Sequence, residues 1–283
     1  MRAHSSNAIL ITGCSSGIGR ATAELLGDRG ELVFATARRP ETIEELEERG
    51  CRVLTLDVTD EASMTEAVRT IESEHGAVGA LINNAGFGLH GAAEETPIDD
   101  VRRQFETNFF GLARLTQMVL PKMRERRRGR IVNVSSMGGK LTFPGGAYYH
   151  ASKHALEAYS DALRFELKPF GVKVVVVEPG LIKTRFGETA VDTVTEPGSG
   201  PYVEFNRSLE KTITGAYEGA MGRFSVGPEV VASTLAKAAT SRRPRSRYLV
   251  PASIAALLLA RRLMPDRAFD AFLRTVYRPP RPH

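Results

Sequence analysis

The sequence predicts an α/β protein of one domain, residues 1–283, in which about seven parallel strands form a doubly wound sheet with helices on both faces. Short apolar runs alternate along the chain with helical patterns, as strands and crossover helices do in such a sheet. Residues 172–177 are almost wholly β-branched, which is typical of a strand buried on both faces. The chain has 283 residues, of which 42% are hydrophobic, and this is enough for one large core.

Each strand is expected at a short apolar run, and each helix where apolar residues recur at three- and four-residue steps. The expected strands are residues 8–11, 32–37, 52–56, 80–82, 130–135, 172–177 and 248–250. The expected helices are the stretch after residue 19, the charged residues 41–49, residues 60–75 with Asp60 as N-cap, and residues 98–126, 147–170, 202–221 and 228–240.

Two late segments have a weaker pattern. Residues 183–226 are rich in Gly, Thr, Ser and Glu, so we expect a substrate loop there with one or two helices. Residues 252–277 have one apolar helical face, and we interpret this C-terminal extension as a lid over a substrate cleft. Contact with a membrane surface is the alternative, because arginines accompany the apolar residues.

A glycine-rich turn separates the first strand from the first helix. It reads Thr12-Gly13-Cys14-Ser15-Ser16-Gly17-Ile18-Gly19, with the spacing GxxxGxG. Such a turn lets a diphosphate approach backbone N–H groups and the positive end of a helix. A tight turn that merely needs backbone freedom is the alternative.

A tyrosine and a lysine share one face of the helix expected at residues 147–170. Tyr149 and Lys153 are four residues apart, whereas Tyr148 is five from Lys153 and points elsewhere. A free phenol titrates near ~10, and a nearby ammonium favours the phenolate, which makes tyrosine a usable acid or base. Taken alone, a chance pairing on one face is the better explanation of this spacing, because YxxxK occurs often by chance.

The motifs together resemble those of the short-chain dehydrogenase/reductase family, over about residues 7–250. They are Thr12-Gly13-x-x-x-Gly17-Ile18-Gly19, Asn83-Asn84-Ala85-Gly86, Asn108, Ser136, Tyr149-x-x-x-Lys153 and Pro179-Gly180. The resemblance implies a Rossmann-type fold and hydride transfer between a nicotinamide cofactor and an alcohol or carbonyl substrate.

The resemblance also implies the role of each site residue. Tyr149 transfers the proton, Lys153 lowers its pKa and binds the nicotinamide ribose, and Ser136 donates to the substrate oxygen. Asn108 holds a water that relays protons to Lys153. Ser135 competes with Ser136, but the family's 13-residue separation from Tyr149 favours Ser136. The expected cofactor contacts are Gly13, Ser15, Ser16, Gly17, Ile18, Gly19, Asp57, Val58, Asn84, Ala85, Gly86, Tyr149, Lys153, Pro179, Gly180, Ile182 and Thr184.

The end of the second strand indicates which cofactor is used. No carboxylate stands there to bind a ribose 2′-hydroxyl, and Arg38 is placed to bind the 2′-phosphate of NADP(H). Arg38 and Arg39 as two solvated charges are the alternative. Ser16 is not basic, so a second phosphate-binding cation of some relatives is missing.

Four phrases look like the 17β-hydroxysteroid/retinol dehydrogenase-like branch of the family. They are Ala35-Thr-Ala-Arg-Arg-Pro40, Asn84-Ala-Gly-Phe-Gly88, Thr107-Asn-Phe-Phe-Gly111 and Val177-Glu-Pro-Gly180. They suggest a bulky apolar alcohol or ketone as substrate. The alternatives are a reductase of small carbonyl compounds and a non-enzymatic redox sensor, although such sensors usually lose the Tyr or the Lys.

Composition and charge limit the partners. The net charge of +5 suits an anionic cofactor better than nucleic acid, because no aromatic residues interleave with the basic clusters.

Cys14 and Cys51 fit a reducing compartment, and no secretory signal or transmembrane run is visible, so we expect a cytoplasmic protein. We expect no metal site. The family often forms a homodimer or homotetramer, for which residues 98–126 and 147–170 are the expected interface.

Overall fold

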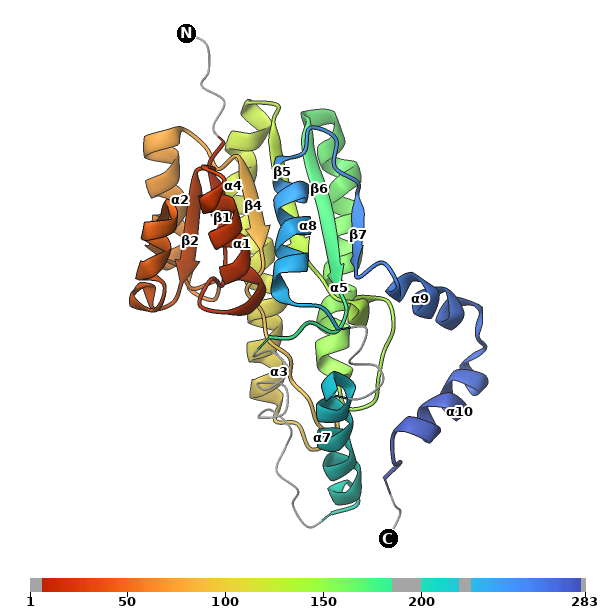
Figure 1. The fold of residues 1–283 in the computed structure, drawn as a ribbon. Coiled ribbons are helices and arrows are strands. Elements are labelled where there is room, and N and C mark those ends of the chain that lie inside the picture. Colours follow the sequence, from red (N-terminus) through yellow and green to blue (C-terminus); the bar gives the residue numbers. More distant parts are fainter. Residues whose placement is uncertain (1–6, 185–199, 219–224, 281–283) are drawn as a thin grey trace.

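A computed structural model describes residues 7–184, 200–218 and 225–280 of the chain (Figure 1). Its centre is a seven-stranded sheet, parallel throughout, in the order β3-β2-β1-β4-β5-β6-β7. The strands are β1 (Ile9–Ile11), β2 (Val33–Ala37), β3 (Cys51–Thr55), β4 (Ala80–Asn83), β5 (Gly129–Val134), β6 (Val172–Pro179) and β7 (Arg247–Val250). The prediction of a doubly wound parallel sheet is confirmed, and its order reverses direction between β1 and β4.

Two apolar clusters lie on opposite faces of the sheet, because successive side chains of a strand point to opposite sides. On one face, Ile11 of β1 packs in a cluster with Leu26 and Leu235. On the other, Leu10 packs with Leu115 and the remaining members of a second cluster. The helices of these layers are α1 (Gly17–Asp28) and α8 (Pro228–Thr240) on the first face, and α2 (Glu61–His75), α4 (Gly111–Glu125) and α5 (Ala147–Leu167) on the second.

The predicted helix at residues 41–49 is wrong. The structure has two short 3₁₀ helices there, η1 (Pro40–Thr42) and η2 (Glu44–Arg49). Only two apolar side chains of this stretch, Ile43 and Leu46, are buried. They are three residues apart, which suits the three residues per turn of a 3₁₀ helix. The next helix follows the prediction, because the Asp60 carboxylate accepts from the backbone N–H of Ala62 at 2.9 Å.

The helical stretch expected at residues 98–126 has a π-helical turn within it. It consists of α3 (Ile98–Phe105), the π turn η3 (Glu106–Phe110) and α4. Asn108 lies in the π turn and is almost fully buried. Single π turns inside α-helices often occur at functional sites. The helix expected at residues 147–170 is α5 followed by the 3₁₀ turn η5 (Lys168–Phe170).

Helix α7 (Val203–Glu218) corresponds to the helix predicted at residues 202–221, and the last residues of that prediction lie outside the described part of the chain. Residues 185–199 and 219–224 of the expected substrate loop, residues 183–226, also lie outside it.

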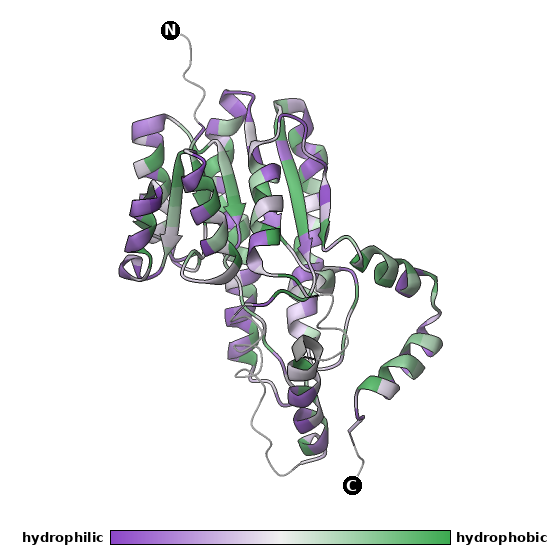
Figure 2. Cartoon of the chain, viewed as in Figure 1, coloured by the Kyte–Doolittle hydropathy of each residue, from purple (hydrophilic) through white to green (hydrophobic). Residues whose placement is uncertain are grey.

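The C-terminal extension forms two helices, α9 (Ile254–Leu263) and α10 (Asp266–Val276), which we call the arm (Figure 1). Met264 adopts extended backbone between them, as expected for a residue that precedes a proline. The arm is largely apolar in Figure 2, yet each helix buries only one side chain, Ile254 and Phe269. No helix in the described ranges is long and apolar enough to cross a membrane.

Candidate active site

The residues singled out in the sequence gather at the carboxyl edge of the sheet. The glycine turn follows β1, Asn84 follows β4, Ser136 follows β5, and Gly180 follows β6. This edge, near the point where the strand order reverses, is where open α/β sheets bind ligands.

The glycine turn has the shape that a dinucleotide diphosphate requires. Gly13 and Gly17 have φ angles of 73° and 58°, which favour glycine. A side chain at Gly19 would overlap the Gly13 carbonyl, so the turn and α1 approach too closely for any other residue. Among the described residues, the side chain of Ser16 makes no capping hydrogen bond at the start of α1. The first N–H groups of the helix are therefore left for an anion, and the turn fits the cofactor diphosphate.

Asn84 and Thr12 lock the turn to the loop after β4. The Thr12 hydroxyl accepts from the backbone N–H groups of Asn84 and Ala85, both at 3.0 Å. The Asn84 side chain donates to the carbonyl oxygens of Thr12 and Gly13 at 2.9 and 3.1 Å. These bonds show a structural role for Asn84, which fixes the glycine turn and the loop after β4 relative to each other.

Asn108 ties the same loop to α5. Its Oδ1 accepts from the Phe87 N–H at 3.1 Å, and its Nδ2 donates to the Phe87 carbonyl at 2.9 Å and to Ser152 Oγ at 3.1 Å. Gly86 leaves a narrow niche beside it. A Cβ atom at Gly86 would lie 3.0 Å from Asn108 Oδ1 and 3.7 Å from Lys153 Nζ. The niche therefore has a hydrogen-bond acceptor on one side and the lysine amine on the other.

Lys153 is buried on α5, where its Nζ donates to the Val134 carbonyl at 3.0 Å. Burial lowers its pKa to about 8, and the negative charge of Glu157 opposes that shift. The amine is thus held at the end of β5, close to its point of titration at neutral to mildly alkaline pH.

Tyr149 is also buried, and its ring contacts two histidine rings. The ring centroids of His90 and His150 are 5.9 and 5.5 Å from that of Tyr149. Tyr148 points away from this site, because its hydroxyl donates to the Ala93 carbonyl at 3.0 Å.

Ser136 and Ser135 differ in access to the cleft. Ser136 is half-buried and begins the short turn η4 (Met137–Gly139), where its Oγ accepts from the Gly138 N–H at 3.0 Å. Ser135 is buried, and its Oγ has no hydrogen-bond partner in the described part of the chain. Of the two side chains, that of Ser136 is the more exposed.

The two other predicted groups of cofactor contacts lie at opposite ends of the site. Arg38 is exposed directly after β2, and no hydrogen bond or ion pair with another described residue engages its side chain. Asp57 Oδ1 accepts from the N–H and hydroxyl of Thr59 at 2.9 and 2.8 Å, so this carboxylate also shapes its own turn. At the other end, Thr184 lies over the glycine turn, 3.4 Å from where a Cβ at Gly17 would be.

The remaining predicted contacts are split between cleft and core. Val58 and Ile182 are buried, and Ile182 forms a parallel bridge with Val226. Gly180 is so close to Ile254 of α9 that a side chain there would overlap it.

Sequence reasoning missed His90 and His150. Burial lowers the pKa of each to about 4, so both are neutral at pH 7. His150 occupies a slot between Gly138 and Gly146, and its Nδ1 donates to the Gly138 carbonyl at 3.1 Å. The available signal was proximity, since His150 directly follows Tyr149 in the sequence. No group of His, Cys, Asp and Glu suited to a metal ion occurs among the described residues.

Comparisons with known proteins agree with this geometry. A family model described as "short chain dehydrogenase" matches residues 7–194. The chain is 43% identical over 204 residues to the 3-ketodihydrosphingosine reductase of Bacteroides thetaiotaomicron, covering 71% of this chain and 74% of that protein. It is 33% identical over 270 residues to the NADPH-dependent 3-dehydrocapnine reductase of Ornithobacterium rhinotracheale, covering 92% and 94%. The crystal structure of a short-chain dehydrogenase from Streptomyces avermitilis superimposes with a TM-score of 0.78, at 34% identity over 96% of both chains.

Proposed function

The chain belongs to the short-chain dehydrogenase/reductase family, and we propose that it is an NADP(H)-dependent member acting on a bulky apolar ketone, aldehyde or alcohol. As an oxidoreductase of this family it interconverts an alcohol and a carbonyl compound with NAD(P)(H). The observation that carries the proposal is the arrangement at the sheet edge. Tyr149 and Lys153 lie buried on one face of α5, which packs against the turn that begins at Ser136, and the same edge of the sheet has a glycine turn that fits a dinucleotide.

In the proposed mechanism the protein polarises the carbonyl and supplies one proton. The nicotinamide supplies or accepts the hydride when the cofactor is bound. The Ser136 hydroxyl donates to the substrate oxygen and stabilises its developing negative charge. Tyr149 gives its phenolic proton to that oxygen in reduction and takes it back in oxidation, and the Lys153 ammonium favours the phenolate.

Asn108 is proposed to hold the water of the proton relay. Its Nδ2 is fully used by Phe87 and Ser152, so a water would bond to the second lone pair of Oδ1. The niche at Gly86 lies between this atom and Lys153 Nζ, which supports the assignment.

The preference for NADP(H) rests on Arg38. Its guanidinium follows β2, where a 2′-phosphate would lie, and no other residue in the described part of the chain pairs with it. The relative from O. rhinotracheale is named as NADPH-dependent, which supports the same preference.

A bulky substrate is supported by the names of two relatives and by the arm. Both relatives are named as reductases of a keto or dehydro compound, 3-ketodihydrosphingosine and 3-dehydrocapnine. The arm places apolar residues beside the site, where Ile254 touches Gly180. The likeness to the 17β-hydroxysteroid/retinol dehydrogenase branch stays a prediction.

The test is the oxidation of NADPH and of NADH with a panel of carbonyl substrates: steroids, retinal, long-chain ketones, aliphatic aldehydes and keto esters. We expect turnover with NADPH and a higher kcat/KM for the large apolar members. A higher kcat/KM for small aldehydes would favour the small-carbonyl alternative. Tight NADPH binding without turnover on any member would favour the redox sensor.

We also propose a cytoplasmic homodimer or homotetramer paired through the long helices. Cys14 and Cys51 are both free and buried, which is compatible with a reducing compartment. Phe110, at the end of the π turn, and Phe165, on α5, are 52% and 82% exposed. Large apolar side chains on the outer face of these helices support an interface there. Light scattering that shows a monomer at micromolar concentration would contradict the pairing.

A further inference from the structure

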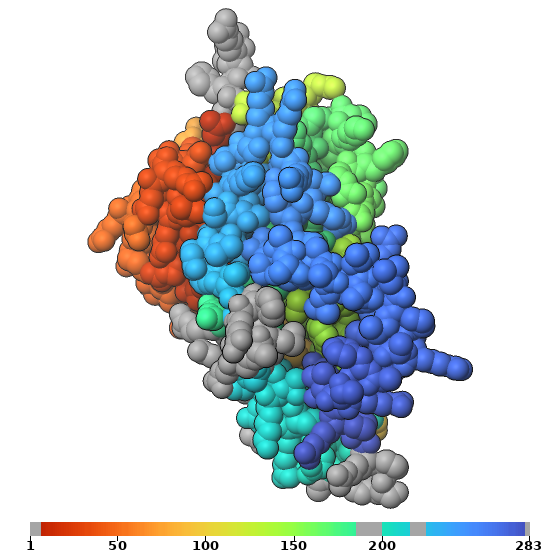
Figure 3. All heavy atoms as spheres, turned by 45° about the vertical axis from the view of Figure 1, so that its right-hand side comes forward, coloured from red at the N-terminus to blue at the C-terminus, as the bar shows by residue number. Residues whose placement is uncertain are grey.

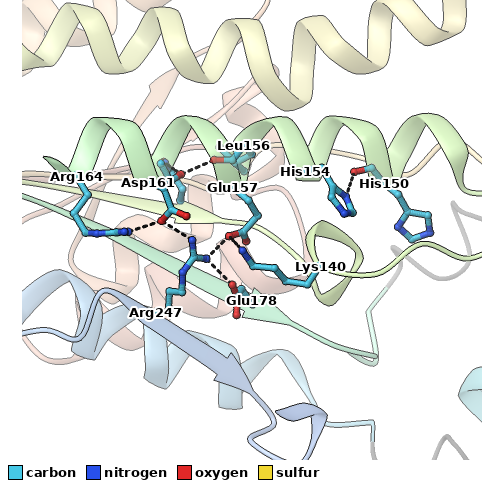
Figure 4. Close-up of polar contacts among 11 residues, drawn as sticks. Lys140, His150, His154, Leu156, Glu157, Asp161, Arg164, Glu178 and Arg247 are labelled. Atoms are coloured by element: carbon cyan, nitrogen blue, oxygen red, sulfur yellow. Dashed lines mark hydrogen bonds and ion pairs between the residues drawn. The ribbon is translucent and has the colours of Figure 1, made fainter. Parts of the chain in front are cut away.

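A cluster of charged side chains lies behind α5, on the side of the helix that faces β6 and β7, and its two carboxylates are buried (Figure 4). We call Lys140, Glu157, Glu178 and Arg247 the buried ion cluster. The Arg247 guanidinium pairs with the Glu157 carboxylate and, at 2.7 Å, with Glu178. Lys140 Nζ lies 2.9 Å from the same Glu157 oxygen. Glu157 is thus held by two cations from different parts of the chain.

The members of the buried ion cluster come from the segments that carry the catalytic groups. Lys140 follows the turn that begins at Ser136, and Glu157 is one helical turn after Lys153. Glu178 directly precedes Pro179 and Gly180 in β6. The cluster therefore links the Ser136 turn, the catalytic face of α5 and the end of β6.

Stability alone does not explain why carboxylates are buried here. The side chains of Glu157 and Glu178 are 5% and 4% exposed, and burying such charges costs several kcal/mol before pairing. Burial and the neighbouring Glu157 raise the pKa of Glu178. Well-packed apolar residues at such positions are often as stable or more stable. Glu157 Oε1 also lacks a hydrogen-bond partner in the described ranges, whereas Oε2 pairs with both cations.

The Glu157 carboxylate acts on Lys153, which lies one helical turn before it on α5. Residues four apart on a helix are neighbours, with Cβ atoms about 6 Å apart. Gly139 packs against α5 at these two residues, because a Cβ atom there would lie 2.9 Å from Glu157 Cγ and 3.1 Å from the Lys153 carbonyl oxygen. The negative charge of Glu157 raises the pKa of Lys153 against the effect of burial.

We propose that Glu157 is a positioning residue of the proton-transfer site: held by Arg247 and Lys140, its carboxylate keeps the buried Lys153 in the ammonium form. The proposal rests on the proposed function, in which the Lys153 ammonium assists Tyr149. The charged groups that face Glu157 are Lys140, Lys153, Glu178 and Arg247, and Asp161 on its own helix contacts Arg247 at 2.5 Å. Loss of the Glu157 charge should therefore let Lys153 lose its proton at lower pH.

The first test is Glu157→Gln, which removes the charge and keeps the size. We expect the alkaline limb of the pH profile of kcat/KM for ketone reduction to move to lower pH by about 0.5 to 2 units. This range follows from Coulomb's law for charges about 6 Å apart at an effective dielectric constant between ~80 and ~20. The pKa of Lys153 in the cofactor-free protein, followed by NMR of ¹³Cε-labelled lysine and assigned with Lys153→Met, should move in the same direction.

Asp161→Asn is the matched control. It removes the same charge from the same helix and from the same arginine, but two turns from Lys153 and at a half-exposed position. A purely structural role of the cluster predicts lower unfolding temperatures for both variants and no change in either pH profile. That result, or an equal shift in both variants, would overturn the proposal.

Lys140→Gln covers the case in which Glu157→Gln does not fold, because the Lys140 side chain is one-third exposed. Removal of this cation strengthens the field of Glu157, so we expect a smaller shift of the Lys153 pKa to higher pH. A shift to lower pH, or none, would count against the role of Glu157. The NMR titration needs no turnover. If wild-type protein reduces no carbonyl compound, the proposed function fails, and the titration still decides the effect of Glu157 on Lys153.

Discussion

The sheet body and the arm are held by contacts of different kinds. In the body, β1 is wholly buried and the loops at its carboxyl edge are joined by paired hydrogen bonds such as those of Thr12 and Asn84. The arm runs from β7 toward α7 across one face of the molecule (Figure 3). It is fixed by Ile254 against Gly180 and by Tyr277 in a small cluster that includes Leu209 of α7. The proposed catalytic groups therefore lie in the sheet body, and the arm is held by fewer buried side chains.

The largest expected effect is the loss of turnover in Tyr149→Phe, because the change removes the transferable proton and keeps the buried ring. General acid catalysis supplies about 10²–10⁴ in rate, so we expect kcat to fall at least about a hundredfold. NADPH affinity, measured by fluorescence titration, should stay within a few-fold, since the turn that fits the diphosphate is not touched.

Tyr148→Phe is the control for this prediction. Its hydroxyl is bonded to Ala93, away from the site, so turnover should change little. If Tyr148→Phe were the more damaging change, Tyr148 and not Tyr149 would be the proton donor, and the site proposed for the sheet body would be wrong.

The free energy of unfolding of the sheet body is expected to fall in acid, whereas the arm should contribute little to this pH dependence. His150 has a pKa of about 4 in the folded protein and about 6.5 when unfolded. Between these values the unfolded chain binds the extra proton, so stability rises with pH and is lost as pH falls from about 6.5 toward 4. The loss attributable to this group is up to about 3 kcal/mol. Urea unfolding of cofactor-free protein at several pH values should show it.

His150→Asn should flatten this acid dependence, because its amide can still donate to Gly138 but does not titrate. The exposed His154 is the matched control, and His154→Asn should keep the wild-type slope. Removal of the arm should also keep it, since the histidine lies in the body. An unchanged slope in His150→Asn would mean that this ring is not the acid-sensitive group.

Arg38→Asp tests the cofactor edge of the body. The carboxylate repels a 2′-phosphate and can accept from a 2′-hydroxyl, so the ratio of kcat/KM for NADPH over NADH should fall at least about tenfold. Arg39→Asp is the control, because its neighbouring charge is also exposed. An equal or larger effect of Arg39→Asp would move the selector to that residue.

The sequence predicted the sheet and the main helices because buried strands are continuous apolar runs and buried helix faces are periodic. The prediction of an α-helix at residues 41–49 was wrong. This stretch is mostly charged and has no apolar helical face, and its two buried apolar side chains are three residues apart, as in a 3₁₀ helix. The π turn was not predictable either. It depends on the bonds of Asn108 to Phe87 and Ser152, which are distant in sequence.

The candidate site was predictable only where its residues lie in motifs. Tyr149, Lys153 and Ser136 were predicted from motif spacing and the family resemblance, and their roles stay predictions, whereas the buried ion cluster was not predicted. Glu157 and Arg247 are 90 residues apart, and the packing of α5 on β6 together with the pairing of β6 with β7 brings them together. His150 was overlooked because one histidine beside a motif does not reveal that its ring will be desolvated.

The smallest effect is expected from removal of the arm, in a chain that ends at Val250. As a lid, the arm should cover a large apolar substrate more than a small one. About 60 Å² of substrate surface removed from water corresponds to about 1.5 kcal/mol, or about tenfold in KM. We therefore expect KM to rise about tenfold for steroid-like or long-chain ketones and little for small aldehydes. NADPH affinity should change little, because the predicted cofactor contacts all precede residue 185.

The alternative is that the arm contacts a membrane surface. Leu259, Leu263 and Phe272 are 57%, 75% and 45% exposed, and Arg262 and Arg267 are exposed near them, which suits anionic lipid. Leu263→Asp separates the two roles, because an outward residue bears on lipid and not on the cleft. As a lid, the full chain should stay in the supernatant with anionic vesicles, and Leu263→Asp should keep the wild-type KM. Co-sedimentation with the vesicles that Leu263→Asp and truncation both abolish, with KM unchanged, would show that the arm is a membrane anchor. Selection of substrates by size would then depend on the sheet body alone.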